Sequence, residues 1–222
     1  MNEKIELPSY HLFVDRYDLY MLGNPIRNEP IPCQVMIDHL EYEVLLNFRG
    51  HHTRNLPKKS YFISFMNPRL HQGNREIHLN AEYIDPSSIR NKLSLDLFES
   101  FGVLSPASQP ILLYVNGSYE GVYLQLESVD EYFLEKRGLP SGSIHYAINN
   151  DANFSLISPI THTEKKSLIV GYERKYGRYK DTLFLQEFIH HLNNFSKNEI
   201  QYEIPKYLEV EKLEDVIGDL DI

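Results

Sequence analysis

The sequence has little that would cross-link it covalently or anchor it in a membrane. Cys33 is its only cysteine, so an intramolecular disulfide and a cysteine-rich zinc site are both excluded. No hydrophobic run approaches the roughly 20 residues that a membrane-spanning helix needs. The first ten residues, MNEKIELPSY, lack the apolar stretch of a secretory signal. These absences predict a cytosolic protein.

The sequence also has fewer basic than acidic residues. The chain has 22 Lys and Arg against 31 Asp and Glu, a formal net charge of -9. We therefore do not expect an extended basic face for duplex nucleic acid or anionic lipid, and any site for a polyanion must be a local cluster. Tryptophan is absent, but 16 Tyr and 11 Phe among 222 residues suffice for a sizeable core in one or two lobes.

Two hairpins are expected in the first half of the chain. Apolar runs on either side of Asp38-His39 predict the first, and runs on either side of Asn116-Gly117, a dipeptide that suits a two-residue turn, predict the second. A further strand follows a polar basic segment. The expected strands are residues 33–37, 43–48, 61–65, 111–115 and 119–126.

The spacing of apolar residues also predicts helices. The first is expected to begin at Asp85-Pro86, to end at Gly102 and to pack on the sheet through an apolar face that includes Leu93 and Leu97. A second is expected to begin with a capping box that starts at Ser128.

The last part of the chain is less regular. Residues 139–179 show only short extended pieces, which favour an irregular excursion or an inserted hairpin. Helical spacing returns over residues 185–192, and Ser196 and Glu199 repeat the spacing of a capping box before Pro205.

A basic segment stands out in this acidic sequence. Residues 49–61 hold Arg49, Arg54, Lys58 and Lys59 together with a glycine. Such a cluster is what a triphosphate would need, because it offers cationic partners beside a flexible backbone. A solvated loop and a site for single-stranded nucleic acid, with Phe48 and Tyr61 as stacking residues, remain alternatives.

Metal chelation is not predicted. The pairs His51-His52 and His190-His191 are the obvious candidates. Adjacent residues face opposite ways on a strand and diverge by about 100° on a helix, so neither pair can chelate an ion.

Several longer segments resemble successive motifs of the CotH kinase family, the atypical protein kinases of the bacterial spore coat. They are RGHHTRNLPKKSYFISF, LNAEYIDPSSIRNKLSLDLFESFGVLSP and LYVNGSYEGVYLQLESVDEYFL, followed by HYAINNDANFSLIS and KSLIVGYERKYG. The resemblance implies an α+β, atypical protein-kinase-like fold, with which the order of the expected elements agrees. Residues 1–128 would form a complete small lobe, an antiparallel sheet plus one helix. Residues 129–222 would form an incomplete, mainly helical large lobe with an irregular insertion at about 139–179.

The same resemblance implies a nucleotide site. The residues that match the family's RG…PKKS motif are Arg49, Gly50, Arg54, Lys58, Lys59 and Ser60. We expect Lys59 to contact phosphate, because it shares one face of an extended strand with Tyr61 and Ile63, although the choice between Lys58 and Lys59 stays open.

Two roles are possible for each of the other matched residues. Glu127 would bind ATP or pair with Arg90 or Lys59, and Tyr146 would stack on adenine or belong to the core. Asp85, Arg90 and Asn91 match a D-P-S…R-N motif, whose role is either to cap and orient the helix or to contribute to the site.

The activity implied by the resemblance is ATP-dependent phosphorylation of serines in other spore coat proteins, with Mg²⁺ or Mn²⁺ as a further cofactor. The partners would be coat proteins, with no nucleic acid or membrane, and the location the mother-cell cytoplasm and then the spore coat. The family's catalytic N-x-D…H-N-Y and metal-binding P-W-D-Y-D segments do not occur in this sequence. We therefore expect a truncated, catalytically incomplete chain with no catalytic or metal-binding residue of its own. The alternative is a non-catalytic structural or assembly protein of the coat.

Overall fold

The structure is a computed structural model that describes residues 6–23, 29–50, 53–66, 69–179 and 181–196, together with Glu199 and Tyr202. The chain divides into two compact units, residues 1–133 and residues 134–222. We call the first the barrel unit and the second the C-terminal unit. No helix among the described residues is both long and apolar enough to cross a bilayer.

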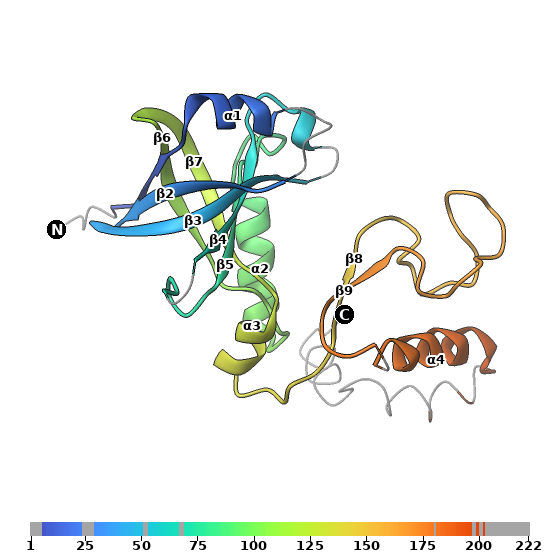
Figure 1. Cartoon of the computed structure of the whole chain (residues 1–222). Helices are drawn as coiled ribbons and strands as arrows, with labels where there is room; N and C mark the ends of the chain where they lie inside the picture. The colour runs from blue at the N-terminus through green and yellow to red at the C-terminus, as the bar shows by residue number, and fades with distance from the viewer. Residues whose placement is uncertain are drawn as a thin grey trace. The chain divides into compact units, whose positions relative to one another are not determined.

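The barrel unit is a closed barrel of seven strands (Figure 1). Around the barrel the strands follow the order β1-β2-β3-β4-β5-β7-β6. The barrel closes where β1 pairs in parallel with β6, and all its other neighbouring strands are antiparallel. The strands are β1 (Ser9–Phe13), β2 (Ile31–Ile37), β3 (Leu40–Arg49), β4 (Ser60–Phe65), β5 (Glu76–Asn80), β6 (Ser108–Val115) and β7 (Ser118–Glu127).

This architecture corrects the expected fold. The protein is mostly β, with a closed mixed barrel and short helices, and it is not a kinase-like small lobe followed by a helical large lobe. The sequence reading missed β1 and β5, two strands of five residues each. Both segments alternate polar and apolar residues, but over too few positions to stand out in the sequence. Strand β1 nevertheless joins the first and last parts of the sheet and thereby closes it.

Alternation along the strands forms the core. In β2 the residues Ile31, Cys33, Val35 and Ile37 are buried, while those between them face outward or are half-buried. Inward-facing residues of every strand fill the barrel in the same way, as expected for a small barrel.

Both predicted hairpins are confirmed. Asp38 and His39 have φ of 48° and 66°, and Asn116 and Gly117 have φ of 49° and 83°. Positive φ at both central residues is the geometry of the two-residue turn that matches the twist of paired strands.

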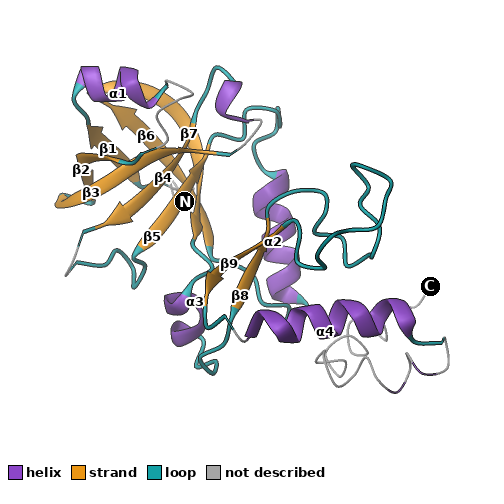
Figure 2. Ribbon diagram, turned by 45° about the vertical axis from the view of Figure 1, so that its right-hand side comes forward, coloured by secondary structure: helices purple, strands orange, loops and turns teal. Residues whose placement is uncertain are grey.

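Two helices accompany the barrel. Helix α1 (Arg16–Leu22) lies at one end of it (Figures 1 and 2), with Asp15 accepting hydrogen bonds from the first-turn N–H groups and Leu22 buried. Helix α2 (Arg90–Ser100) begins later than expected and buries none of its residues. Leu93 is 56% exposed and Leu97 47% exposed, so the expected packing of this face on the sheet is wrong. A closed barrel buries its apolar face inside, and its outer surface needs no covering helix.

Further helices and strands follow β7. Helix α3 (Glu131–Lys136) begins two residues later than the predicted capping box implies, because Asp130 and not Ser128 accepts hydrogen bonds from its first N–H groups. A two-stranded antiparallel sheet of β8 (Ile144–Ala147) and β9 (Tyr172–Tyr176) precedes α4 (Asp181–Asn194) (Figure 2).

The second predicted capping box is present. The Ser196 N–H donates to the Glu199 carboxylate at 2.8 Å, and the Glu199 N–H donates to the Ser196 hydroxyl at 3.3 Å. Pro205 lies outside the described residues.

Candidate functional site

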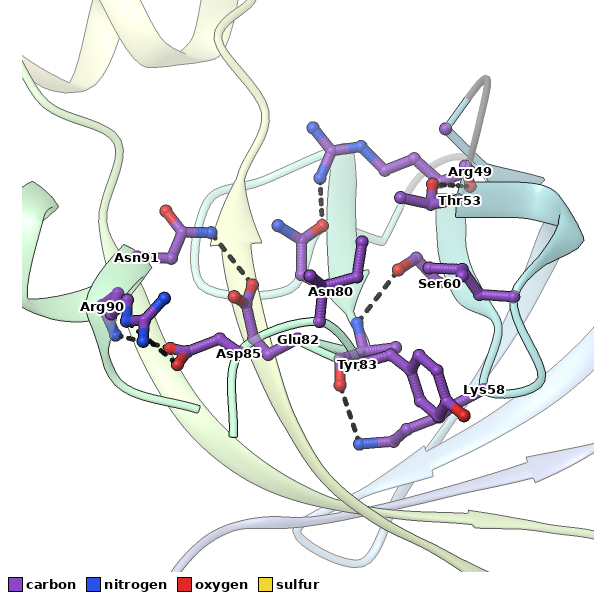
Figure 3. A pocket seen from close by; sticks show the side chains of 14 residues that line it. Arg49, Thr53, Lys58, Ser60, Asn80, Glu82, Tyr83, Asp85, Arg90 and Asn91 are labelled. Carbon is purple, nitrogen blue, oxygen red and sulfur yellow. Dashed lines mark hydrogen bonds and ion pairs between the residues drawn. The ribbon is translucent and has the colours of Figure 1, made fainter. Parts of the chain in front are cut away.

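A pocket of about 450 Å³ opens at one end of the barrel (Figure 3). It lies where β3 ends, β4 begins and β5 ends, because the antiparallel pairing of these strands brings the three ends together. The segment from β5 to the start of α2 forms the opposite wall. Its described lining residues are Arg49, Gly50, Thr53, Leu56, Lys58, Ser60, Asn80, Ala81, Glu82, Tyr83, Ile84, Asp85, Arg90 and Asn91.

Lys58 is held firmly at this end of the barrel. Its ammonium donates to the carbonyl oxygens of Ala81 at 2.9 Å and Val122 at 2.6 Å, and it lies 4.2 Å from the centre of the Tyr123 ring. Partial burial lowers the pKa of the Lys58 amine, against the opposing influence of Glu82 and Glu120. An ammonium has three N–H donors, so the two carbonyls leave one for a ligand in the pocket.

The loop after β3 needs glycine. Gly50 has φ of +94°, and a Cβ atom on this residue would lie 1.8 Å from the Thr53 Oγ1 atom. Thr53, which lies close to Gly50, begins a short 3₁₀ helix, η1 (Thr53–Asn55). Gly50 and Thr53 both line the pocket. The Arg49 guanidinium beside them donates to Asn80 at the end of β5.

The opposite wall is organised by Asp85. Its carboxylate accepts hydrogen bonds from the Ser87 hydroxyl at 2.7 Å and the Arg90 N–H at 3.0 Å, and it also pairs with the Arg90 guanidinium at 3.3 Å. These interactions, with the Ser87 hydroxyl first, lower the pKa of Asp85 to about 2. Asn91 donates to Glu82 at 3.0 Å across the same turn. Asp85, Arg90 and Asn91 therefore join α2 to the rim of the pocket.

The balance of charge is uneven across the pocket. Arg49, Lys58 and Arg90 face Glu82 and Asp85 among the described lining residues. Arg90 is paired with Asp85, and Figure 3 shows the side chains of Arg49 and Lys58 on the other side of the pocket from this pair. An anionic group entering the pocket would be attracted to that side.

The structure separates the two candidate lysines. Lys59 donates to the Arg54 carbonyl oxygen at 2.7 Å and lies 5.9 Å from the Phe48 ring, and it is not among the described lining residues. Arg54 donates to the Phe48 carbonyl oxygen at 2.6 Å and is likewise outside the described lining. Ser60 does line the pocket, where its hydroxyl accepts from the Ala81 N–H at 3.0 Å.

Glu127 lies farther along the barrel. It pairs with Ile77, whereas the pocket is at the Asn80 end of β5, so about three residues or roughly 10 Å of strand separate them. The Glu127 carboxylate is buried and accepts from the Ala107 N–H at 3.0 Å.

Tyr146 belongs to β8 in the C-terminal unit. Like Glu127, it is absent from the described lining. The structure thus brings together Arg49, Gly50, Lys58 and Ser60 of the eight residues expected to bind nucleotide.

Part of the pocket wall was not predicted from the sequence. Thr53, Asn80, Glu82 and Tyr83 were not proposed as site residues, although three of them belong to the LNAEYIDPSS segment already singled out by resemblance. Among the described residues, no three His, Cys, Asp or Glu side chains are grouped so that they could hold a metal ion. His51 and His52 lie outside the described residues.

Four residues that line the pocket, Arg49, Gly50, Lys58 and Ser60, come from a motif on which the family resemblance rests. The model of the CotH kinase protein family matches residues 46–215, and the chain belongs to this family.

Two relatives from Bacillus subtilis (strain 168) are similar to the chain. Inner spore coat protein H is 46% identical over 213 residues, which cover 96% of this chain and 59% of that protein. Inner spore coat protein H-like protein is 39% identical over 71 residues, which cover 32% of this chain and 22% of that protein. The chain therefore spans about 59% of the length of the first relative.

Proposed function

We propose that the pocket at the end of the barrel binds the phosphates of ATP, and that the protein acts in ATP-dependent phosphorylation of serines in other spore coat proteins. The observation that carries the proposal is the position of Lys58, whose ammonium is held by two carbonyl oxygens at the pocket wall. The two carbonyl oxygens fix the Lys58 ammonium where an anion in the pocket can reach it.

The other groups on the same side suit a phosphate chain. Arg49 supplies a guanidinium, which binds phosphate oxygens in a fork geometry. Gly50 lets the backbone approach closely, and the Thr53 and Ser60 hydroxyls add polar contacts. The volume of about 450 Å³ lies within the range of small-molecule sites.

Mg²⁺ or Mn²⁺ is proposed to arrive with the nucleotide, because these ions bind phosphate oxygens and neutralise charge during phosphoryl transfer. The described acids of the pocket are already engaged, Asp85 by N–H and O–H donors and Glu82 by Asn91. They fit a structural role in the wall better than that of a dedicated metal cage.

The substrate and the location rest on the relatives. Both similar proteins are named for the inner spore coat. Coat proteins are accordingly the proposed partners, and the mother-cell cytoplasm followed by the spore coat is the proposed location. A non-catalytic role in coat assembly is the second candidate, favoured by the exposed apolar face of α2, where Leu93, Leu97 and Phe98 are each about half exposed.

Nucleotide binding separates the two candidates. The purified chain is titrated with a fluorescent ATP analogue, with and without Mg²⁺ or Mn²⁺, and Lys58→Gln is compared with the matched variant Lys59→Gln. We expect Lys58→Gln to weaken binding at least tenfold and Lys59→Gln to change it less than threefold. Lys58→Arg, which keeps the charge, should retain part of the affinity.

Folding is monitored in parallel, because Lys58→Gln also removes two hydrogen bonds to carbonyl oxygens. Circular dichroism at the titration temperature identifies any variant that has unfolded. If the folded wild-type chain binds no nucleotide at millimolar concentration, the ATP proposal is wrong and the assembly role is favoured. If Lys59→Gln causes the larger loss, the phosphate contact belongs to Lys59.

A further inference from the structure

The C-terminal unit has a basic pocket of its own. It has a volume of about 780 Å³ and lies beside the ends of β8 and β9 and the first residue of α4. Its described lining residues are Ser141, Gly142, Arg174, Lys175, Tyr176, Gly177, Arg178 and Asp181.

An irregularity in the hairpin brings two cations to the same pocket. Ile144 pairs with Tyr176 and His145 pairs with Arg174, so Lys175 is an extra residue on β9 with no partner position on β8. Neighbouring residues of a regular strand point to opposite faces, whereas a bulge changes the direction of a side chain. The bulge explains how Arg174 and Lys175 both line the pocket.

The third cationic residue, Arg178, directly follows a glycine with positive φ. Gly177 has φ of +98°, and a Cβ atom there would lie 1.9 Å from the Ser143 Oγ atom. The Asp181 carboxylate fixes this corner by accepting from the Ser143 hydroxyl at 2.6 Å and from the Arg178 N–H at 3.0 Å. The backbone at Arg178 is therefore fixed to the first residue of α4.

The charge of this pocket opposes that of the chain as a whole. Three described lining residues are cationic and one is acidic, in a protein whose formal net charge is -9. The acidic residue, Asp181, already accepts two hydrogen bonds. Burial and then the charge of Arg174 lower the pKa of His145 on β8, so the field of Arg174 extends into the hairpin.

We propose that this pocket binds a phosphate monoester, and that the phosphate is carried by a serine of a protein segment. Guanidinium groups bind the oxygens of a phosphate dianion in pairs, and Arg174 and Arg178 offer two such groups at one pocket. The volume exceeds the needs of a lone phosphate ion and leaves room for the flanking residues of a peptide. The described residues that line it differ from those that line the pocket of the barrel unit, and neither proposal depends on the other.

The test is a direct binding measurement on the full chain. A fluorescein-labelled neutral peptide with one phosphoserine is titrated by fluorescence anisotropy, beside the same peptide with serine or with glutamate at that position. We expect the phosphoserine peptide to bind at least tenfold more tightly than either. We expect Arg174→Gln to weaken its binding at least tenfold, while Lys166→Gln, which removes an exposed cation elsewhere in the unit, changes it less than twofold.

The source of the phosphate is identified by competition. Displacement of the peptide by inorganic phosphate or AMP only at concentrations well above the peptide Kd supports a phosphorylated protein segment. Displacement at comparable concentrations supports a phosphate-monoester site whose ligand is a small molecule. Equal binding of the three peptides, or equal effects of Arg174→Gln and Lys166→Gln, would overturn the proposal. Arg174→Gln should leave binding of the ATP analogue unchanged, which keeps the two sites distinct.

Discussion

The glycine at the start of the basic loop should not tolerate a side chain. In Gly50→Ala the new methyl group would lie 1.8 Å from the Thr53 Oγ1 atom and 3.2 Å from its Cβ atom, at a φ of +94°. An alanine at positive φ costs roughly 1–2 kcal/mol, and forcing an extra methyl group into packed surroundings costs about 1–3 kcal/mol more. We therefore expect the free energy of unfolding to fall by roughly 2–5 kcal/mol.

A second glycine separates the two contributions. Gly102 has a comparable φ of +74°, but a Cβ atom there meets nothing within 4 Å. Gly102→Ala should thus show the conformational cost alone, about 1–2 kcal/mol. In a Thr53→Ala background the 1.8 Å overlap with Oγ1 disappears and only the 3.2 Å contact remains. In that background, Gly50→Ala should lower the free energy of unfolding less than it does in the wild type, and the difference should be about 1–3 kcal/mol.

Urea denaturation followed by far-ultraviolet circular dichroism measures these differences, and titration with the ATP analogue follows the pocket. Gly50→Ala should weaken nucleotide binding, because Gly50 and Thr53 both line the pocket, whereas Gly102→Ala should not. Equal destabilisation by the two glycine substitutions, with no relief from Thr53→Ala, would refute the steric argument.

Three further predictions concern titration and capping. Burial lowers the pKa of Lys58 from 10.5. The unfolded chain then binds more protons than the folded one between the lowered pKa and 10.5, so this residue makes the free energy of unfolding rise with pH in that window. NMR of ¹³C-methylated lysines should show the lowered pKa of Lys58, and this pKa should increase when ATP binds. The pKa of Asp85 is about 2 against 3.8 for the unfolded residue, so its stabilising effect is present above pH 3.8 and lost as pH falls towards 2, and acid titrations of Asp85→Asn should lack that loss. Asp130→Ala should cost about 1 kcal/mol of stability as the loss of a helix cap, and a larger effect from Ser128→Ala in the same thermal unfolding assay would contradict the observed cap.

Only some of the candidate site residues could be predicted from the sequence. The basic segment and its glycine were visible because they are contiguous, and Gly50 and Lys58 do line one pocket. The expectation for Lys59 rested on alternation with Tyr61, but Lys59 precedes β4, and beyond the strand its side chain turns to the Arg54 carbonyl oxygen. Alternation constrains a side chain only while the strand is paired.

Strand pairing between segments distant in sequence also decides which of the expected residues reach the same site. Glu127 ends a strand that the sequence predicts clearly, yet its distance from the pocket depends on its register with Ile77 on β5, a strand that was not predicted. The second basic pocket was hidden for a similar reason, since the bulge at Lys175 is created by the pairing of β8 with β9.

The sequence by itself determined the features that depend on neighbouring residues. Asp38-His39 and Asn116-Gly117 form their tight turns because these residues tolerate positive φ, and the alternating runs beside them pair as antiparallel hairpins. Only the tertiary structure decided that the sheet closes. Closure depends on Ser9–Phe13, which pairs in parallel with β6 about 100 residues away, and no local pattern encodes the partner of so short a strand.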